Sequence, residues 1–221
     1  METATREKRN VIFHDPPFIV DLFNNTRWGW LWLIMRIYLG YSWLTSGLGK
    51  VGNPAWMQTG QALAGFWTNA TRIPEPPARP LIAFEWYRSF ILSLLDQGAY
   101  TWFAKVIVFG EILIGIALIL GAFVGISAFF GAFMNWNFMM AGSASTNPLM
   151  FLFTIFLILA WKTAGWIGLD RWLLQALGTP WQPGERFRTR PRPEAPEALP
   201  VTGPGVYETD RDENNDVNTR A

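Results

Sequence analysis

The chain has 221 residues, half of them apolar, and a formal net charge of +1. It has no cysteine and one histidine, which excludes disulfides, thiolate chemistry, Cys-ligated zinc and iron–sulfur clusters, and we expect no metal or haem bound by a recognisable motif. The balanced charge gives no basis for nucleic-acid binding, while 13 Trp and 17 Phe are far above ordinary usage.

Residues 1–27 are mostly polar and include two adjacent prolines, Pro16 and Pro17. We expect an extended or loosely ordered N-terminal arm, with at most a short interfacial turn over 18–23. Arg27 closes this arm before the first apolar segment.

Four apolar segments approach the length of about 20 residues that a helix needs to cross a bilayer. Trp or Tyr stands near most of their ends, as is typical of side chains at a membrane interface. The predicted fold is an all-α integral membrane protein with a bundle of four transmembrane helices in a domain over 28–177. The spans are expected over 28–48, 102–123, 125–142 and 148–166.

The segment 49–101 contains no spanning run. Two amphipathic pieces, 54–70 and 81–97, flank the proline-rich stretch 72–80, and we expect them to form an extracytoplasmic segment at the membrane surface. From Gly178 the composition changes to Pro, Arg and acidic residues, which predicts a polar cytoplasmic tail over 178–221 that is disordered on its own.

Orientation follows from basic residues near the span ends. The segment 49–101 is poor in Lys and Arg for its length, whereas basic residues gather before the first span and after the fourth. We therefore expect both termini to be cytoplasmic, in the cytoplasmic membrane of a prokaryote. These basic residues are Arg6, Lys8, Arg9 and Arg27 before the first span, and Lys162, Arg171, Arg186, Arg188, Arg190 and Arg192 from the end of the fourth span onward.

Three polar side chains interrupt the apolar spans at similar depth. Counted from the cytoplasmic span ends, Arg36 lies at ~12 Å, Asn135 at ~15 Å and Glu111 at ~18 Å along their helices. A charge at membrane depth needs a partner, so we predict that Arg36 pairs with Glu111 and that both are candidate catalytic residues. The alternative is a purely structural ion pair that fixes the register of two helices.

Further candidates surround this predicted pair. Asn135 and Asn137 are expected to complete its hydrogen bonds, and Tyr38 or Tyr41 to line the same cavity. Lys50, at the outer end of the first span, is a further binding candidate, or alternatively an anchor at the membrane surface.

The motifs resemble the DoxX/DoxD family of small four-helix membrane proteins, and among these most closely DoxD. The matching motifs are Arg36 and Gly40 followed by GLGK (47–50), GE (110–111) with IGIALILG (114–121), MNWNFMMAGS (134–143) with Asn147–Pro148, and GLDRW (168–172). The family often carries an arginine in the short inner loop, and residues 123–125 here have none.

The resemblance implies quinone-linked oxidoreduction, with electrons passing from thiosulfate or a partner protein to quinone. This chain would be the membrane subunit, embedded in the lipid bilayer. A non-catalytic accessory or structural subunit of a larger respiratory or photosynthetic complex is the alternative, with neighbouring subunits or a second copy as partners. A transporter is a third possibility, although no internal repeat supports it.

Overall fold

The computed structural model describes residues 15–179 and 182–186, and within these ranges the fold is mostly helical, as predicted. Residues 1–14 of the expected arm, and residues 180–181 and 187–221 of the expected tail, lie outside these ranges. The four longest helices occupy the four predicted apolar segments. They are α2 (Gly29–Val51), α6 (Tyr100–Leu120), α7 (Val124–Met140) and α8 (Asn147–Leu159).

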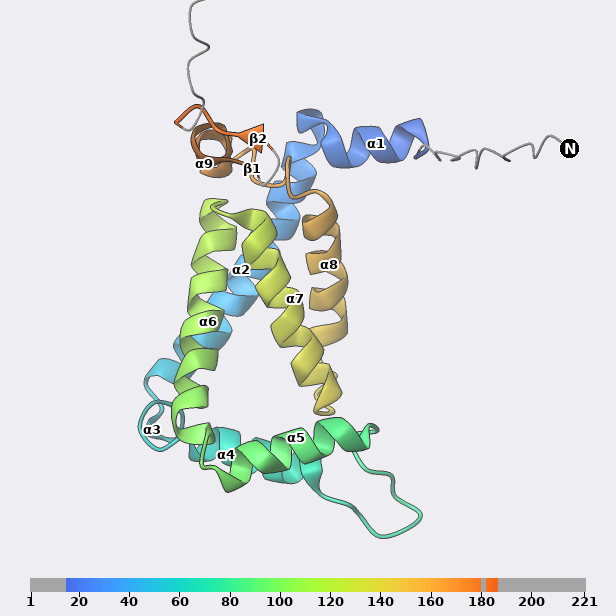
Figure 1. Ribbon diagram of the computed structural model, residues 1–221, viewed down its shortest axis with the longest axis vertical. Coiled ribbons are helices and arrows are strands. Elements are labelled where there is room, and N and C mark those ends of the chain that lie inside the picture. The colour runs from blue at the N-terminus through green and yellow to red at the C-terminus, as the bar shows by residue number, and fades with distance from the viewer. Residues whose placement is uncertain (1–14, 180–181, 187–221) are drawn as a thin grey trace, which may run out of the picture. The chain divides into compact units, whose positions relative to one another are not determined.

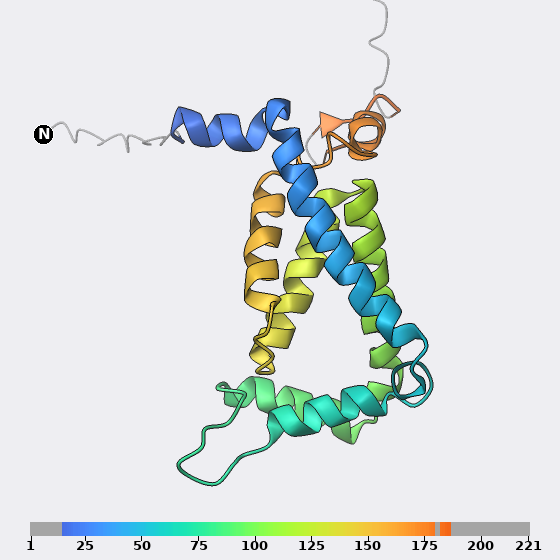
Figure 2. The ribbon, with the colours of Figure 1, turned by 180° about the vertical axis from the view of Figure 1, so that it is seen from behind.

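These four helices pack around one hydrophobic core. Helix α2 runs along α6, and α7 runs along α8 (Figures 1 and 2). Trp32, Leu39 and Trp43 of α2 meet Leu118 of α6 and Leu157 of α8 in this core. The apolar faces that drive the packing are therefore contributed by segments far apart in the sequence.

The predicted boundaries needed one substantial correction, at the end of the fourth apolar segment. Helix α8 stops at Leu159, and the residues up to 166 form turns rather than the last turns of a span. Thr163 donates its hydroxyl hydrogen to the backbone oxygen of Phe23 at 2.9 Å. This contact fixes a turn against the segment before α2, which a continuing helix would not provide.

Helix α6 is the one helix within the described residues that is both long and apolar enough to cross a membrane. Helix α2 has 23 residues but carries Arg36 and Lys50, while α7 and α8 have 17 and 13 residues.

The predicted amphipathic segment forms short helices at one end of the bundle (Figure 1). The first piece is broken at Gly60, whose φ of +73° suits glycine and whose Cα faces the backbone of Tyr100 too closely for a side chain. Leu63 and Trp67 pack with Ile91 in a second core. The helices are α3 (Pro54–Met57), α4 (Gln61–Thr71) and α5 (Glu85–Asp96).

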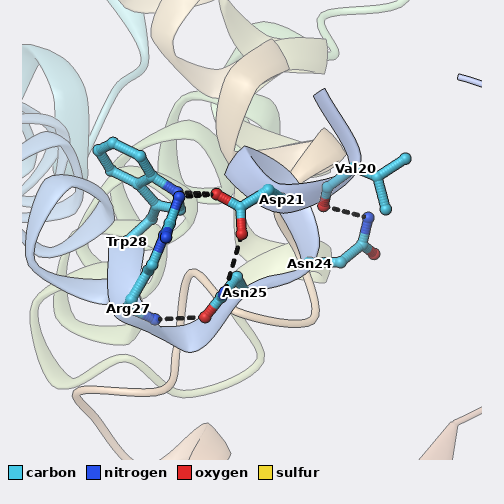
Figure 3. Close-up of polar contacts among 6 residues, drawn as sticks. All are labelled: Val20, Asp21, Asn24, Asn25, Arg27 and Trp28. Carbon is cyan, nitrogen blue, oxygen red and sulfur yellow. Dashed lines mark hydrogen bonds and ion pairs between the residues drawn. The ribbon is translucent and has the colours of Figure 1, made fainter. Parts of the chain in front are cut away.

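The expected extended arm is helical where it is described. Helix α1 (Pro17–Asn24) is followed by a 3₁₀ turn, η1 (Thr26–Trp28). Figure 3 shows how Asp21 joins them: it accepts hydrogen bonds from Trp28 Nε1 at 2.9 Å and Asn25 Nδ2 at 2.8 Å, and pairs with Arg27. The hydrogen bonds from Trp28 and Asn25 lower the pKa of Asp21 and so favour the ionised form of its carboxylate.

The chain leaves α8 through these turns and enters α9 (Asp170–Leu177). Strands β1 (Gly178–Thr179) and β2 (Gln182–Pro183) then pair antiparallel, so the beginning of the expected tail is folded back on itself.

Candidate functional site

Glu111 lies on α6 with its side chain 2% exposed and forms an ion pair with Lys50 at the end of α2. The Lys50 Nζ to Glu111 Oε2 distance is 2.6 Å. Lys50 Nζ also donates to Ser46 Oγ at 2.6 Å and lies 5.3 Å from the centre of the Trp56 ring. The ammonium group is thus held on several sides, next to the buried Glu111 carboxylate.

Close packing of α2 against α6 creates this pair. A Cβ added at Gly47 would lie 2.6 Å from Ile112 Cγ1 and 3.2 Å from Glu111 Cβ. A Cβ added at Gly115 would likewise lie 2.6 Å from the backbone nitrogen of Leu44. Small residues let the two backbones approach, and that register places Lys50 opposite Glu111.

The predicted pair of Arg36 and Glu111 is wrong. Arg36 is buried at the other end of α6, where its Nη1 packs against Gly121 and Gly168 and its Nη2 donates to the backbone oxygen of Ile167 at 2.7 Å. The depth count assumed that both helices start in one plane. Instead, Arg36 is about two turns into α2 and lies level with Gly121 at the end of α6. Glu111 is ten residues earlier in α6, which places it about 15 Å from that level.

Arg36 belongs to a separate polar cluster with Asp170. The Asp170 carboxylate accepts hydrogen bonds from the backbone N–H groups of Phe123 at 2.6 Å and Val124 at 2.9 Å. These are the unpaired donors at the start of α7. Burial raises the pKa of Asp170, while the two N–H donors and nearby Arg36 act in the opposite direction. This cluster ties α2, α7 and α9 together and takes Arg36 out of the candidate catalytic site.

A cavity of about 270 Å³ opens beside Glu111, and we call it the polar cavity. Most of the side chains around it carry hydroxyl, amide, indole N–H or carboxylate groups. Tyr41 is among them, as predicted, whereas Tyr38 packs edge-on against Phe153 elsewhere. The lining residues are Tyr41, Ser42, Trp43, Thr45, Ser46, Glu111, Phe138, Thr146, Asn147 and Met150.

Asn135 is fully buried, and its side-chain amide has no hydrogen-bond partner among the described residues. Trp43 Nε1, at the wall of the polar cavity, likewise lacks one in the described part of the chain. A Cβ at Gly131, one turn before Asn135, would lie 3.3 Å from this nitrogen. Asn135 is not among the residues that line the polar cavity and bonds neither Glu111 nor Arg36, so the prediction that it completes their hydrogen bonds is wrong. Buried polar groups are normally paired, so the Trp43 N–H at the cavity wall is a donor left for a ligand or water.

Asn137 serves a different cavity. The Tyr87 hydroxyl bonds to the backbone and side-chain oxygens of Asn137, each at 3.1 Å, and Asn137 Nδ2 donates to the oxygen of Phe133 at 2.8 Å. Burial raises the pKa of Tyr87 to about 12, so the phenol stays neutral and can donate.

Both Tyr87 and Asn137 line a second cavity of about 370 Å³, here called the apolar cavity. Its other walls are aromatic and aliphatic side chains of the outer helices α4 and α5 and of α6 and α7. They include Leu63, Phe66, Trp67, Phe90, Ile91, Leu94, Phe103, Ile107, Met134 and Phe138.

The sequence alone did not identify Ser46, Trp43 or Thr146 as site residues. The sequence pattern could have identified Ser46, because Ser46 and Lys50 are four residues apart and therefore share a helix face. Thr146 becomes adjacent only through the packing of α8. Among residues 15–179 and 182–186, no three His, Cys, Asp or Glu side chains gather as metal ligands.

No family model, curated protein or solved structure matches this chain.

Proposed function

We propose that this chain is a four-span membrane protein of the DoxX/DoxD type that takes part in quinone-linked oxidoreduction. The membrane assignment is supported by large apolar side chains that point outward from the bundle. Leu113 is 66% exposed, Phe129 58% and Leu159 56%. Apolar surface on this scale is typical of contact with lipid or with another subunit.

The orientation is also part of the proposal, with both termini in the cytoplasm of a prokaryotic cell. Thr163 and Lys162, after α8, contact Phe23 and Asn24, before α2, so the segments flanking the four helices lie together. Helices α3, α4 and α5 would then lie on the outer surface. The short helix α8 would complete its crossing with the turn residues that follow it.

One observation carries the functional proposal: a buried carboxylate, paired with Lys50, lines a hydrogen-bonding cavity inside an apolar bundle. Reduction of a quinone consumes two electrons and two protons and yields a quinol. The Trp43 N–H in the cavity wall, unpaired among the described residues, would donate a hydrogen bond to a quinone carbonyl, and Glu111, held by Lys50, would pass protons to it. The electrons would come from thiosulfate or from a partner subunit, because this chain has no motif for an electron carrier.

A non-catalytic accessory subunit of a respiratory or photosynthetic complex is the second candidate. Exposed aromatic side chains on the outer helix α5 favour it, since Trp86 is 59% and Phe90 48% exposed. In that case a neighbouring subunit or a second copy of the chain would cover this surface, and the Lys50–Glu111 pair would serve stability alone.

The deciding experiment is to purify the protein with its native neighbours, identify bound quinone and subunits, and assay thiosulfate-dependent quinone reduction. Glu111→Gln should slow turnover by ~100-fold or more, because the amide keeps the shape and accepts the Lys50 bond but cannot carry a proton. Glu85→Gln is the matched control, since Glu85 is exposed and pairs with Arg88 on the same surface helix. Absence of quinone and of activity, together with stable incorporation into a respiratory or photosynthetic assembly, would establish the accessory role.

A further inference from the structure

The two cavities share one wall. Phe138 of α7 lines the polar cavity and the apolar cavity, and it packs against both hydrophobic cores. Its side chain is half-buried, and Phe138 is the one described residue common to the linings of these two cavities, which differ sharply in chemistry. The χ angles of this aromatic side chain can rotate at the boundary between them.

The apolar cavity offers little to a polar ligand. Its one polar pair is internally satisfied, because Tyr87 donates to Asn137 and Asn137 donates to Phe133. The remaining walls present hydrocarbon and aromatic rings, which favour a hydrocarbon occupant. Phe133 and Phe90, both in its wall, are about half exposed, so a chain can enter from the side of the bundle.

The polar cavity has the opposite character. Glu111, Lys50, Ser46 and the unpaired Trp43 N–H lie at or beside it, and its volume of about 270 Å³ is near the lower limit of ordinary ligand pockets, ~300 Å³. That volume suits a head group of one ring better than a complete lipid-soluble ligand.

We propose that the two cavities are halves of one site for an amphiphilic quinone, whose head group lies in the polar cavity and whose prenyl chain passes Phe138 into the apolar cavity. This inference rests on the proposed function for the identity of the head group. It adds that the prenyl chain, and not the head group alone, determines the affinity of the protein for the quinone.

The test uses two unlabelled quinones with the same head group, one without a side chain and one prenylated. Each displaces a radiolabelled quinone without a side chain from the detergent-solubilised full-length protein. Leu94→Trp narrows the apolar cavity, and Leu92→Trp is the matched control on the same helix, because Leu92 is outside the cavity wall. Phe66→Trp is a second cavity-filling variant, in case Leu94→Trp fails to fold.

For the wild type, the prenylated quinone should bind at least ~10-fold more tightly than the other, as expected when a few methylene groups are buried. Leu94→Trp and Phe66→Trp should remove this difference and leave the affinity of the quinone without a side chain unchanged. Leu92→Trp should preserve it. If both quinones bind but the filling variants leave the preference intact, this inference is wrong and the proposed function stands. If the wild type binds neither quinone, the proposed function fails with it.

Discussion

Lys50 is the residue that allows Glu111 to remain inside the bundle. An isolated carboxylate in an apolar interior pays a large desolvation penalty, and an ammonium group at 2.6 Å offsets it. Ser46 and Trp56 hold the ammonium in place, so its orientation is fixed before any ligand binds.

This pairing predicts strong coupling between two substitutions. Lys50→Met and Glu111→Leu should each lower the free energy of unfolding by up to ~3–5 kcal/mol, because each leaves one charge without its partner. The double variant should recover most of that loss. The measurement is unfolding in mixed micelles, with all four members of the cycle.

Arg36→Leu combined with Glu111→Leu is the control cycle, since Arg36 packs at Gly121, ten residues or about 15 Å along the helix direction from Glu111. Their effects should add to within ~0.5 kcal/mol. Coupling here, and none between Lys50 and Glu111, would restore the pairing that the sequence predicted.

Residue types in the site were predictable, but partners were not. Glu111 and Tyr41 stood out as polar groups inside apolar segments, and both line the polar cavity, whereas Asn135, predicted on the same ground, does not. Arg36 was assigned the wrong partner because the relative slide of α2 and α6 depends on glycine contacts between them, which a depth count along single helices does not include.

At the scale of helices, the closeness of α2 and α6 depends on where glycine stands. Gly47 faces Ile112 and Glu111, whereas a Cβ at Gly49, two residues later in α2, would meet nothing within 4 Å. Both glycines are inside α2, and they differ mainly in that α6 packs against Gly47 and not against Gly49.

Gly47→Ala should therefore destabilise the protein by ~1–3 kcal/mol, because the added methyl group overpacks the contact and displaces Glu111. Gly49→Ala should be neutral or stabilising by ~0.4–1 kcal/mol, because alanine favours an open helical position. Thermal unfolding of the two variants side by side measures this. Equal effects would show that the Gly47 contact is not tight.

Helix positions followed well from hydropathy, since the four long helices and the outer helices all occupy segments expected from the sequence. Helix ends followed less well. The end of α8 is set by the Thr163 contact with Phe23, and the break before α4 by the contact of Gly60 with Tyr100. Both depend on residues more than 35 positions away, which a local pattern does not contain.

For the molecule as a whole, membrane topology is the property with the most consequences. Contacts of Thr163 with Phe23, and of Lys162 with Asn24, place the two flanking segments together. The proline-rich connection 72–84 instead belongs with α4 and α5 at the other end of the bundle (Figure 2). A bundle of four crossings requires this arrangement, because an even number returns the chain to its starting side.

Reporter fusions test this arrangement directly in cells. A fusion after Arg186 should report a cytoplasmic location, because the basic residues near α1 and after α8 favour the inner side. A fusion inserted between Glu75 and Ala78, where the chain is exposed, should report the outer side. Adding basic residues at this second position alone should weaken the outer signal, since the Lys and Arg bias sets orientation. The same signal from both fusions would rule out four crossings and would place the Lys50–Glu111 pair in a protein of different topology.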